Sequence, residues 1–395
     1  MDLAELVASW PLTSIACNAD NPDLLKYLSN SPISGRTIRL RYDRSPDFFK
    51  LLHYQADRHV TFISRNSGGT VTGMGSVSVR EGYLHGAPTP VGFLSDLRIS
   101  PDRGIALNWH RYYQQLLEQS HTLKELDGCS HFVTAVIDSN AVAQQSLIVP
   151  KRKPGYTYDL LAKYVMVNIL GPIPSLFRPR DSKPPPGYTV TQGSADDLDE
   201  LTDFLEQQHR CRPFGYCFRT GELERRLRVW DSPSARFALN QFIIMRGARG
   251  RIRGCLAPWA PTDAKTTFVD RFAFKVRLLR LIGRVLTGIK FPKHGQALRI
   301  LYLTHVETDL TLPLAERQRV FRAMLDHVVD STRNRDWHIL AFADFVQDPL
   351  ATDLAEYVTY RVPMALYQVR SSRPEPRGIA SPFGAVSPGF EIALV

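Results

Sequence analysis

The sequence has no long apolar run and little cysteine. No uninterrupted stretch reaches the roughly 18 apolar residues that a membrane-spanning helix needs. The 5 cysteines are scattered without a C-x-x-C pair, which argues against a disulfide framework and favours reduced thiols. Cys211, Cys217 and His209 have part of a zinc-site spacing but lack a fourth ligand, so we expect no metal. The N-terminus, Met1-Asp-Leu-Ala-Glu-Leu6, lacks the basic region of a secretory signal. These absences predict a cytoplasmic protein, soluble or peripheral.

The charge balance points to anionic partners. The formal net charge is +10 and the sequence pI is about 9.4, which favours nucleotide or CoA phosphates or an acidic membrane surface. The sequence has no RNP, zinc-finger or helix-turn-helix motif, so we expect no nucleic acid. Hydrophobic residues make up 44% of the chain, enough for a sizeable core, and 395 residues favour two domains.

Repeated prolines between residues 171 and 187 divide the chain into two halves, because proline interrupts both helices and central strands. Residues 371–388 are rich in Pro, Ser and Gly and predict a tail. The closing Phe390–Val395 segment is a candidate edge strand that the sequence alone does not settle. The predicted organisation is an N-terminal segment (1–36), a first domain (37–170), a linker (171–187), a second domain (188–370) and a tail (371–395).

The most informative stretch runs from Val91 to Tyr156. A strand over 91–99 leads into a turn containing Gly104 and then into an amphipathic helix. A glycine turn that opens a helix after a strand aims free N–H groups at one point, which suits a phosphate or pyrophosphate. The helix places these apolar residues on one face: Ile105, Trp109, Tyr112, Tyr113, Leu116 and Leu117.

The two halves follow a similar element order, which suggests duplication of one α/β unit. In the first half we predict strands over 37–41, 60–65, 70–80, 91–99, 131–137 and 156–168, and helical segments over 46–56 and 139–148. In the second half we predict strands over 188–192, 237–246, 251–258, 297–306 and 338–345, a strand pair over 358–370, and helices over 194–208, 313–333 and 349–356.

The element order resembles the GCN5-related N-acetyltransferase (GNAT) fold, and the chain resembles a tandem pair of such domains. In the first half, Ser95-Asp-Leu-Arg-Ile-Ser-Pro101 resembles the family's fourth strand. Arg103-Gly-Ile-Ala106 resembles the end of its pyrophosphate loop, Asn140-Ala-Val-Ala143 its N-x-x-A motif, and Gly155-Tyr156 its Gly-aromatic pair. The expected fold class is α/β, with two tandem domains that each have a mixed, mostly antiparallel sheet flanked by helices.

The resemblance implies an acyl-CoA-dependent N-acyltransferase, with acetyl-CoA or another acyl-CoA as donor and a small-molecule or peptide amine as acceptor. It implies Asp96 as general base, with the alternative that Asp96 is an exposed carboxylate or pairs with Arg98. It also implies an oxyanion donor at the backbone of Leu97 or Ile99. The expected CoA-binding residues are Leu97, Ile99, Arg103, Gly104, Ile105, Ala106 and Asn140. His110 and His131 are weaker catalytic candidates than structural ones.

The sequence also departs from the family pattern. The loop is about two residues short, and Leu147 stands where the family often has the tyrosine that protonates the thiolate. Tyr156 or Tyr158, or a water, then takes that role. In the second half, the corresponding segment 304–313 has no glycine and carries Glu307 and Asp309, which would repel phosphates, so we expect that half to be degenerate.

Two alternatives follow from these features. The missing tyrosine and the short loop are compatible with a non-catalytic ligand-binding protein. The basic stretch 272–293, with Arg277, Arg280 and Arg284 on one side, is compatible with a peripheral-membrane acyl or aminoacyl transferase or with a helix that packs on the core and has a solvated basic face.

Overall fold

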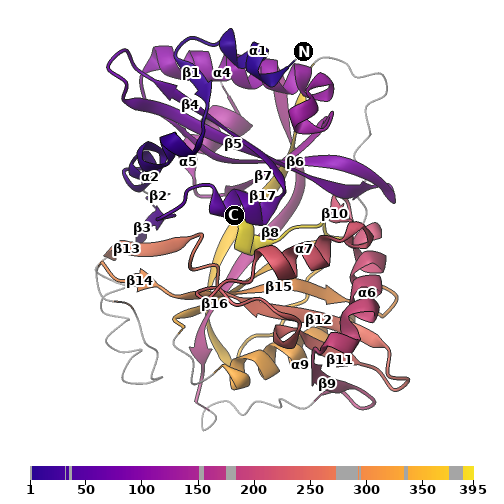
Figure 1. The fold of residues 1–395 in the computed structure, drawn as a ribbon. Coiled ribbons are helices and arrows are strands. Elements are labelled where there is room, and N and C mark those ends of the chain that lie inside the picture. Colours follow the sequence, from indigo (N-terminus) through magenta and orange to yellow (C-terminus); the bar gives the residue numbers. More distant parts are fainter. Residues whose placement is uncertain are drawn as a thin grey trace.

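The computed structural model describes residues 2–31, 33–34, 38–150, 155–174, 184–272, 292, 295–332, 337–372 and 386–395. The N-terminal half occupies the top of Figure 1 and the C-terminal half the bottom, with the C-terminus between them. The strands of the first half are β1 (Thr13–Ile15), β2 (Ile33–Ser34), β3 (Ile38–Asp43), β4 (Arg58–Arg65), β5 (Val71–Leu84), β6 (Ala87–Ile99), β7 (His131–Ile137) and β8 (Tyr156–Pro172). Its helices are α1 (Leu3–Ala8), α2 (Asn21–Ser29), α3 (Lys50–Gln55), α4 (Arg103–Gln119) and α5 (Ala141–Ala143).

The second half is also built from strands and helices. Its strands are β9 (Thr189–Gln192), β10 (Gly215–Tyr216), β11 (Ile243–Arg246), β12 (Ile252–Trp259), β13 (Thr266–Phe272), β14 (Ala297–Leu298), β15 (Ile300–Thr308), β16 (Ile339–Phe345) and β17 (Tyr357–Ser371). Its helices are α6 (Leu198–Arg210), α7 (Glu222–Val229) and α9 (Leu314–Ser331).

The two halves share one sheet because each contributes a long strand to the other. Within the described ranges the sheet has 13 strands, in the order β1-β4-β5-β6-β7-β17-β8-β16-β15-β12-β11-β9, with β10 paired to β5. β17 therefore lies between two strands of the first half, and β8 lies next to β16 of the second (Figure 1). The two long strands run antiparallel, from Tyr156 opposite Ser371 to Pro172 opposite Tyr357. Both are rich in aromatic and β-branched residues, as long paired strands usually are.

A second, four-stranded sheet also joins the halves, in the order β14-β13-β3-β2. β3, which the sequence predicts as the first strand of the N-terminal unit, pairs there with β13 of the second half. Thr267, for example, lies opposite Tyr42. This sheet brings the segment after β3 next to residues of the C-terminal half.

The helices cover the main sheet in the way their apolar faces predict. Trp109, Tyr112, Leu116 and Leu117 of α4 are buried, and they pack with α1 against β4, β5 and β6. In the second half, α9 buries Val320, Phe321, Met324 and Val328 against β11, β12 and β16. The mixed α/β fold class is confirmed.

Several predicted elements are wrong in whole or in part; the predicted strand 237–246, for example, is a strand only from Ile243 to Arg246. Residues 349–356 form a loop with turns and bends rather than a helix. The Leu350 and Ala351 amides of this loop donate hydrogen bonds to the Asp344 carboxylate. Residues 358–370 form one strand rather than a pair. Residues 386–395 of the predicted tail are packed into the protein: Ile392, Ala393 and Leu394 join the core shared by both halves. Apolar burial outweighs the loop-like composition there.

Candidate functional site

Strands β6 and β7 separate in the middle of the first half. They pair in parallel only from Val91 opposite His131 to Phe93 opposite Val133. Beyond this point β6 carries a bulge, where the register with β5 shifts and Asp96 has a left-handed φ of +57°. A bulge bends its strand and increases its twist, so β6 turns away from β7. The result is a gap in the sheet.

A cavity of about 820 Å³ lies at this gap, within the size range of ligand pockets. Its walls come from both faces of the sheet. On the α4 face the lining is almost entirely apolar: Trp10, Phe62, Val77, Leu94, Leu97, Trp109, Tyr112 and Leu116. On the other face, polar and aromatic side chains join aliphatic ones: Tyr42, Arg44, Asp96, Arg98, Lys265, Thr267, Tyr302 and His338.

Asp96 lies on the cavity wall in a bidentate ion pair. Its two carboxylate oxygens accept hydrogen bonds from Arg44 at 2.7 and 2.8 Å, and both side chains are buried. From the sequence we considered Arg98 as a partner of Asp96, but in the structure the partner is Arg44. Of the Asp and Glu residues that the structure describes, Asp96 alone lines this cavity. Its role as base stays a prediction.

Lys265 is a wall residue that the sequence did not single out. Its ammonium lies 4.9 Å from the centre of the Tyr302 ring and donates a hydrogen bond to a Val395 oxygen. Burial lowers the pKa of Lys265 to about 7, and the positive charge of Arg44 acts in the same direction, opposed by Asp96. The site thus includes a buried amine whose pKa is well below that of an exposed lysine.

The two candidate tyrosines of β8 have different surroundings. Tyr156 is buried under α4, where its hydroxyl lies 2.5 Å from His110 Nδ1. Tyr158 lines the cavity, and its hydroxyl lies 3.0 Å from that of Tyr113. Burial raises the pKa of both Tyr156 and Tyr158. Tyr158 is therefore better placed than Tyr156 to act on a ligand in the cavity.

The N-terminus of α4 is not the open phosphate cradle that the sequence predicts. Asp102 caps the helix, and its Oδ1 accepts hydrogen bonds from the amides of Gly104 (2.8 Å) and Ile105 (3.0 Å). The Ala106 amide donates to the Asp102 carbonyl. The Asp102 carboxylate thus occupies the amides of Gly104 and Ile105, and the Asp102 carbonyl occupies that of Ala106, so none of the three is a free donor. Their role in CoA binding stays a prediction. The Arg103 side chain is exposed, and its phosphate role stays a prediction.

The other predicted binding groups lie at the gap. Leu97 and Asn140 line the cavity, and Asn140 also caps α5 by accepting a hydrogen bond from the Ala143 amide at 3.2 Å. The Ser100 amide donates to the carbonyl of Thr72 in β5. Successive amides of a strand point to opposite edges, so the Ile99 amide points away from β5, toward the gap. By the same alternation the Leu97 amide faces the gap. Leu147, where the family has a tyrosine, is part of the wall.

The second half contains a comparable bulge, but side chains fill the space beside it. β15 and β16 pair in parallel from Ile300 to Tyr302, and His305 then has a φ of +51°. Asp96 and His305 both stand three residues after the last parallel pair, at Phe93 and Tyr302. The His305 side chain is 1% exposed and packs against Trp230, Phe237 and Phe242.

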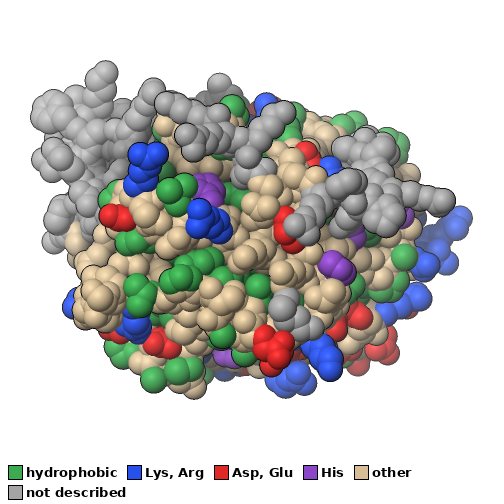
Figure 2. Space-filling view, turned by 90° about the horizontal axis from the view of Figure 1, so that it is seen from above, with side chains coloured by type: hydrophobic (Ala, Val, Ile, Leu, Met, Phe, Trp, Pro, Cys, Tyr) green, Lys and Arg blue, Asp and Glu red, His purple; other side chains and the backbone are tan. Residues whose placement is uncertain are grey.

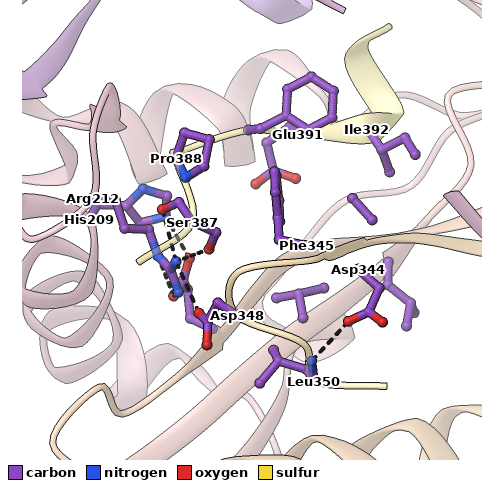
Figure 3. A pocket seen from close by; sticks show the side chains of 15 residues that line it. His209, Arg212, Asp344, Phe345, Asp348, Leu350, Ser387, Pro388, Glu391 and Ile392 are labelled. Atoms are coloured by element: carbon purple, nitrogen blue, oxygen red, sulfur yellow. Dashed lines mark hydrogen bonds and ion pairs between the residues drawn. The ribbon is translucent and has the colours of Figure 1, made fainter. Parts of the chain in front are cut away.

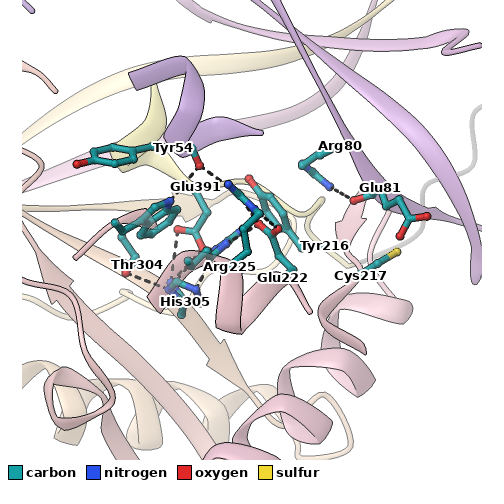
Figure 4. A network of polar contacts seen from close by, with 12 residues as sticks. Tyr54, Arg80, Glu81, Tyr216, Cys217, Glu222, Arg225, Thr304, His305 and Glu391 are labelled. Carbon is teal, nitrogen blue, oxygen red and sulfur yellow. Dashed lines mark hydrogen bonds and ion pairs between the residues drawn. The ribbon is translucent and has the colours of Figure 1, made fainter. Parts of the chain in front are cut away.

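Charged groups hold this filled site together. Arg226 Nη1 lies 2.9 Å from His305 Nε2 and 3.1 Å from Glu391, and Arg226 Nε lies 2.8 Å from Glu222. Figure 4 shows Glu222, His305 and Glu391 in this network. The remaining space beyond the bulge is a cavity of about 50 Å³. Arg212 donates a hydrogen bond there to Ser387 of the C-terminal segment (Figure 3). Arg212 also pairs with Glu307.

Other candidates from the sequence do not converge on the cavity. His209 accepts a hydrogen bond from the Tyr216 amide through Nδ1, while Cys211 is exposed and Cys217 buried. Most of the basic stretch 272–293, including Arg277, Arg280 and Arg284, lies outside the described residues. Among the described helices, none is long and apolar enough to cross a bilayer. On the end of the molecule that carries α1 and α4, Lys and Arg side chains are interspersed with Asp and Glu (Figure 2).

Comparison with known proteins gives structural matches only. No family model matches the chain. No curated protein matches it by sequence. Two structures of Saccharomyces cerevisiae N-myristoyltransferase with bound myristoyl-CoA match with TM-scores of 0.56 and 0.58 and identities of 11% and 9%. The alignments cover 93% of this chain and 84% and 80% of the yeast chains.

A GCN5-related glucosamine N-acetyltransferase region of a fungal multi-domain β-N-acetylglucosaminidase also matches. Its TM-score is 0.53 at 14% identity, over 90% of this chain and 38% of that one. At these identities the matches show the fold alone, and they confirm the fold that the sequence motifs suggested.

Proposed function

Taking the fold of the GCN5-related N-acetyltransferase superfamily as the premise, we propose that this protein transfers an acyl group from an acyl-CoA thioester to an amine. The observation that carries the proposal is the cavity of about 820 Å³ at the gap between β6 and β7. Its lining is apolar on the α4 face and mixed, with polar, aromatic and aliphatic side chains, on the other face. A thioester at the gap would have room for its acyl chain on one side and for an amine on the other.

The size and lining of the apolar chamber favour a long acyl chain. An acetyl group would leave most of this volume empty, and the side chains of Trp10, Phe62, Trp109 and Tyr112 offer an acyl chain a surface shielded from water. Each buried methylene contributes about 0.8 kcal/mol. The yeast N-myristoyltransferase structures, which contain myristoyl-CoA, support an apolar acyl donor for this fold. We therefore expect chains longer than the acetyl group that the sequence suggested.

The chain supplies a group for each step of direct transfer. The amides of Leu97 and Ile99 face the gap and are the proposed donors to the oxyanion. Asp96, held by Arg44, is the proposed acceptor of the amine proton. The amine nitrogen forms a bond to the thioester carbonyl carbon, and the carbon–sulfur bond breaks. Tyr158 is the proposed donor of the proton that the thiolate takes up.

The test is a series of acyl-CoAs offered to the full-length protein. Acetyl-, octanoyl-, myristoyl- and palmitoyl-CoA are compared by thermal unfolding and by release of free thiol in the presence of mixed amines. A ligand at a hundred times its Kd should add about 2.7 kcal/mol to the free energy of unfolding. We expect the long-chain donors to stabilise the protein and to release thiol. No stabilisation by any donor would overturn the proposal.

One observation favours a second candidate, a non-catalytic protein that binds acylated ligands. Asp102 occupies the amides that would hold the carrier's diphosphate. This candidate predicts stabilisation by long-chain fatty acids and acyl-CoAs alike, with no thiol release in a broad amine screen. Amine-dependent thiol release would eliminate it.

A further inference from the structure

The apolar chamber, the part of the cavity on the α4 face, extends across the sheet away from the gap. Leu97 of β6 borders the gap, and a side chain at Gly75 of β5 would lie 3.5 Å from Leu97 and 3.2 Å from the Trp109 ring. Gly75 in turn is paired with Phe62 of β4, and all four residues line the cavity. Because neighbouring strands lie about 4.8 Å apart, this lining extends about 10 Å from β6 to β4.

Trp10 lies at the far end of this lining. It belongs to the segment between α1 and β1, and its ring centroid lies 5.5 Å from that of Phe62 and 4.7 Å from that of Tyr112, on which it stacks. The strand beyond β4 is β1, and no residue of β1 is among the described residues that line the cavity. Leu12, two residues after Trp10, is 64% exposed. The chamber therefore ends at Trp10, and the protein surface begins just beyond it.

Trp10 is fixed in this position by contacts with α4. Its indole N–H donates a hydrogen bond to Gln115 Oε1 at 2.6 Å, and the Tyr112 hydroxyl donates one to the carbonyl of Pro11 at 3.1 Å. The segment around Trp10 and the helix α4 share one apolar cluster and lie together at the top of Figure 1. The indole ring is thus a fixed wall. Since Gln115 is exposed, its amide can turn to water when Trp10 is replaced.

We propose that Trp10 closes the apolar chamber and limits the length of the acyl chain that the protein accepts. This inference rests on the proposed function, which assigns the chamber to the acyl group. A chain that enters at the gap passes over β5 and meets the indole ring at β4. Each methylene buried before that point should tighten binding about fourfold. Methylenes beyond that point have no space and should add nothing.

The test measures how binding depends on chain length. A saturated series from octanoyl- to eicosanoyl-CoA is titrated into the full-length protein by calorimetry, below the concentrations at which the donors form micelles. In the wild-type protein we expect the affinity to rise with length up to a limit and then to level off or fall. An affinity that rises without a limit to eicosanoyl-CoA would overturn the inference.

Trp10→Ala should move this limit to longer chains. Loss of the indole opens apolar space beyond β4, so the affinity should continue to rise over about two or more further carbons. A chain two carbons past the wild-type limit should bind about tenfold more tightly to Trp10→Ala than to the wild type. Trp10→Phe keeps part of the ring volume and should tighten the same chain about threefold.

Leu6→Ala is the matched control. Leu6 lies on α1 in the same segment, is 4% exposed like Trp10 and belongs to the same apolar cluster, but it does not line the cavity. Its loss should lower the melting temperature without moving the length limit. A shift as large as that of Trp10→Ala would show that loosening of this segment moves the limit, and the inference would fail.

The outcomes distinguish the inference from the proposed function. If Trp10→Ala extends the length limit but no donor releases thiol with any amine, the transfer reaction fails and the role of Trp10 stands. If long-chain donors release thiol and the limit is the same in the wild type and in Trp10→Ala, the inference fails and the transfer reaction stands. Thermal unfolding shows whether each variant is folded. If Trp10→Ala is not, Trp10→Phe decides, and an unchanged affinity for the longer chain overturns the inference.

Discussion

The two halves of the protein place the same backbone feature in opposite surroundings. Each has a parallel strand pair that separates after a short overlap, and each has a bulge with a left-handed residue three positions later, Asp96 or His305. The Asp96 bulge borders a cavity of about 820 Å³. The His305 bulge is packed by aromatic rings, and the space beside it is about 50 Å³.

The difference shows how one half can fill the space beside such a bulge while the other half leaves it open. In the second half, Trp230, Phe237 and Phe242 pack against His305 at the bulge, and Glu391 of the C-terminal segment pairs with Arg226 there. Buried aromatic area and the ion pairs of Arg226 contribute to the stability of that half without a ligand. The first half keeps an open cavity, which is the expected condition of a binding site. The predictions below change one half and use the other as the reference.

The largest effect should follow removal of the acid in the open half. Asp96→Asn keeps a side chain that tolerates the left-handed conformation but leaves Arg44 buried without its partner. Breaking such a pair costs about 3 kcal/mol, and loss of a general base lowers kcat by about a hundredfold or more. Thermal unfolding and initial rates of thiol release measure the two effects.

The double variant Arg44→Met with Asp96→Asn separates these effects. It removes the uncompensated charge, so most of the lost stability should return while the activity stays low. Recovery of activity together with stability would show that Asp96 supports the fold and does not act on the amine.

The next prediction fills the open cavity. Ala135 and Ala343 occupy equivalent positions of β7 and β16, two residues after the last parallel pair, and line the large and the small cavity respectively. Ala135→Phe should lower acyl-CoA affinity by about tenfold or more with little change in stability, because the ring enters available space. Ala343→Phe should leave affinity unchanged but cost about 1–3 kcal/mol, because it overpacks a filled site. Calorimetry and thermal unfolding of both variants test this contrast, which a similar stability loss in both would contradict.

Tyr158 and Tyr156 offer a comparison within one strand. Tyr158→Phe should lower kcat about tenfold with little change in KM, below the usual contribution of a general acid because a thiolate leaves easily. Tyr156→Phe, which removes a hydroxyl that faces His110, should change stability by about 1 kcal/mol and leave kcat unchanged. Equal loss of kcat in both variants would argue against Tyr158 as the proton donor.

Local patterns in the sequence predicted most of the elements and one wall of the site. The 3.6-residue period located the buried face of α4, and the strand before the turn placed Asp96 at the gap. Arg44 lies 52 residues from Asp96, and Lys265 comes from the other half. Arg44 and Lys265 reach the cavity because the halves exchange strands and because β3 pairs with β13. No local sequence pattern predicts these pairings.

Two errors had signals in the sequence. Asp102 directly precedes the first residue of α4, and Asp is a favoured N-cap, so its occupation of the next amides was predictable. In the same way, the apolar residues at the end of the Pro-rich tail indicated burial, which the structure confirms for Ile392 and Leu394.

The smallest expected effect concerns that cap. Asp102→Ala should lower stability by about 1 kcal/mol, the usual value of a side-chain N-cap, and Asp102→Asn should keep most of it. In the second half, α9 starts after Pro313 with no side-chain cap, so a helix of this protein can start without one.

We expect acyl-CoA affinity in Asp102→Ala to stay within about twofold, because the cap amides are used within the helix and do not hold the diphosphate. The opposite result would be an acyl-CoA affinity that increases about fivefold, because the amides are free and a negative charge near the helix N-terminus is gone. That result would show that the diphosphate binds at the N-terminus of α4. Calorimetry with acyl-CoA and with the free fatty acid distinguishes the two results, because the free acid has no diphosphate to respond to the change.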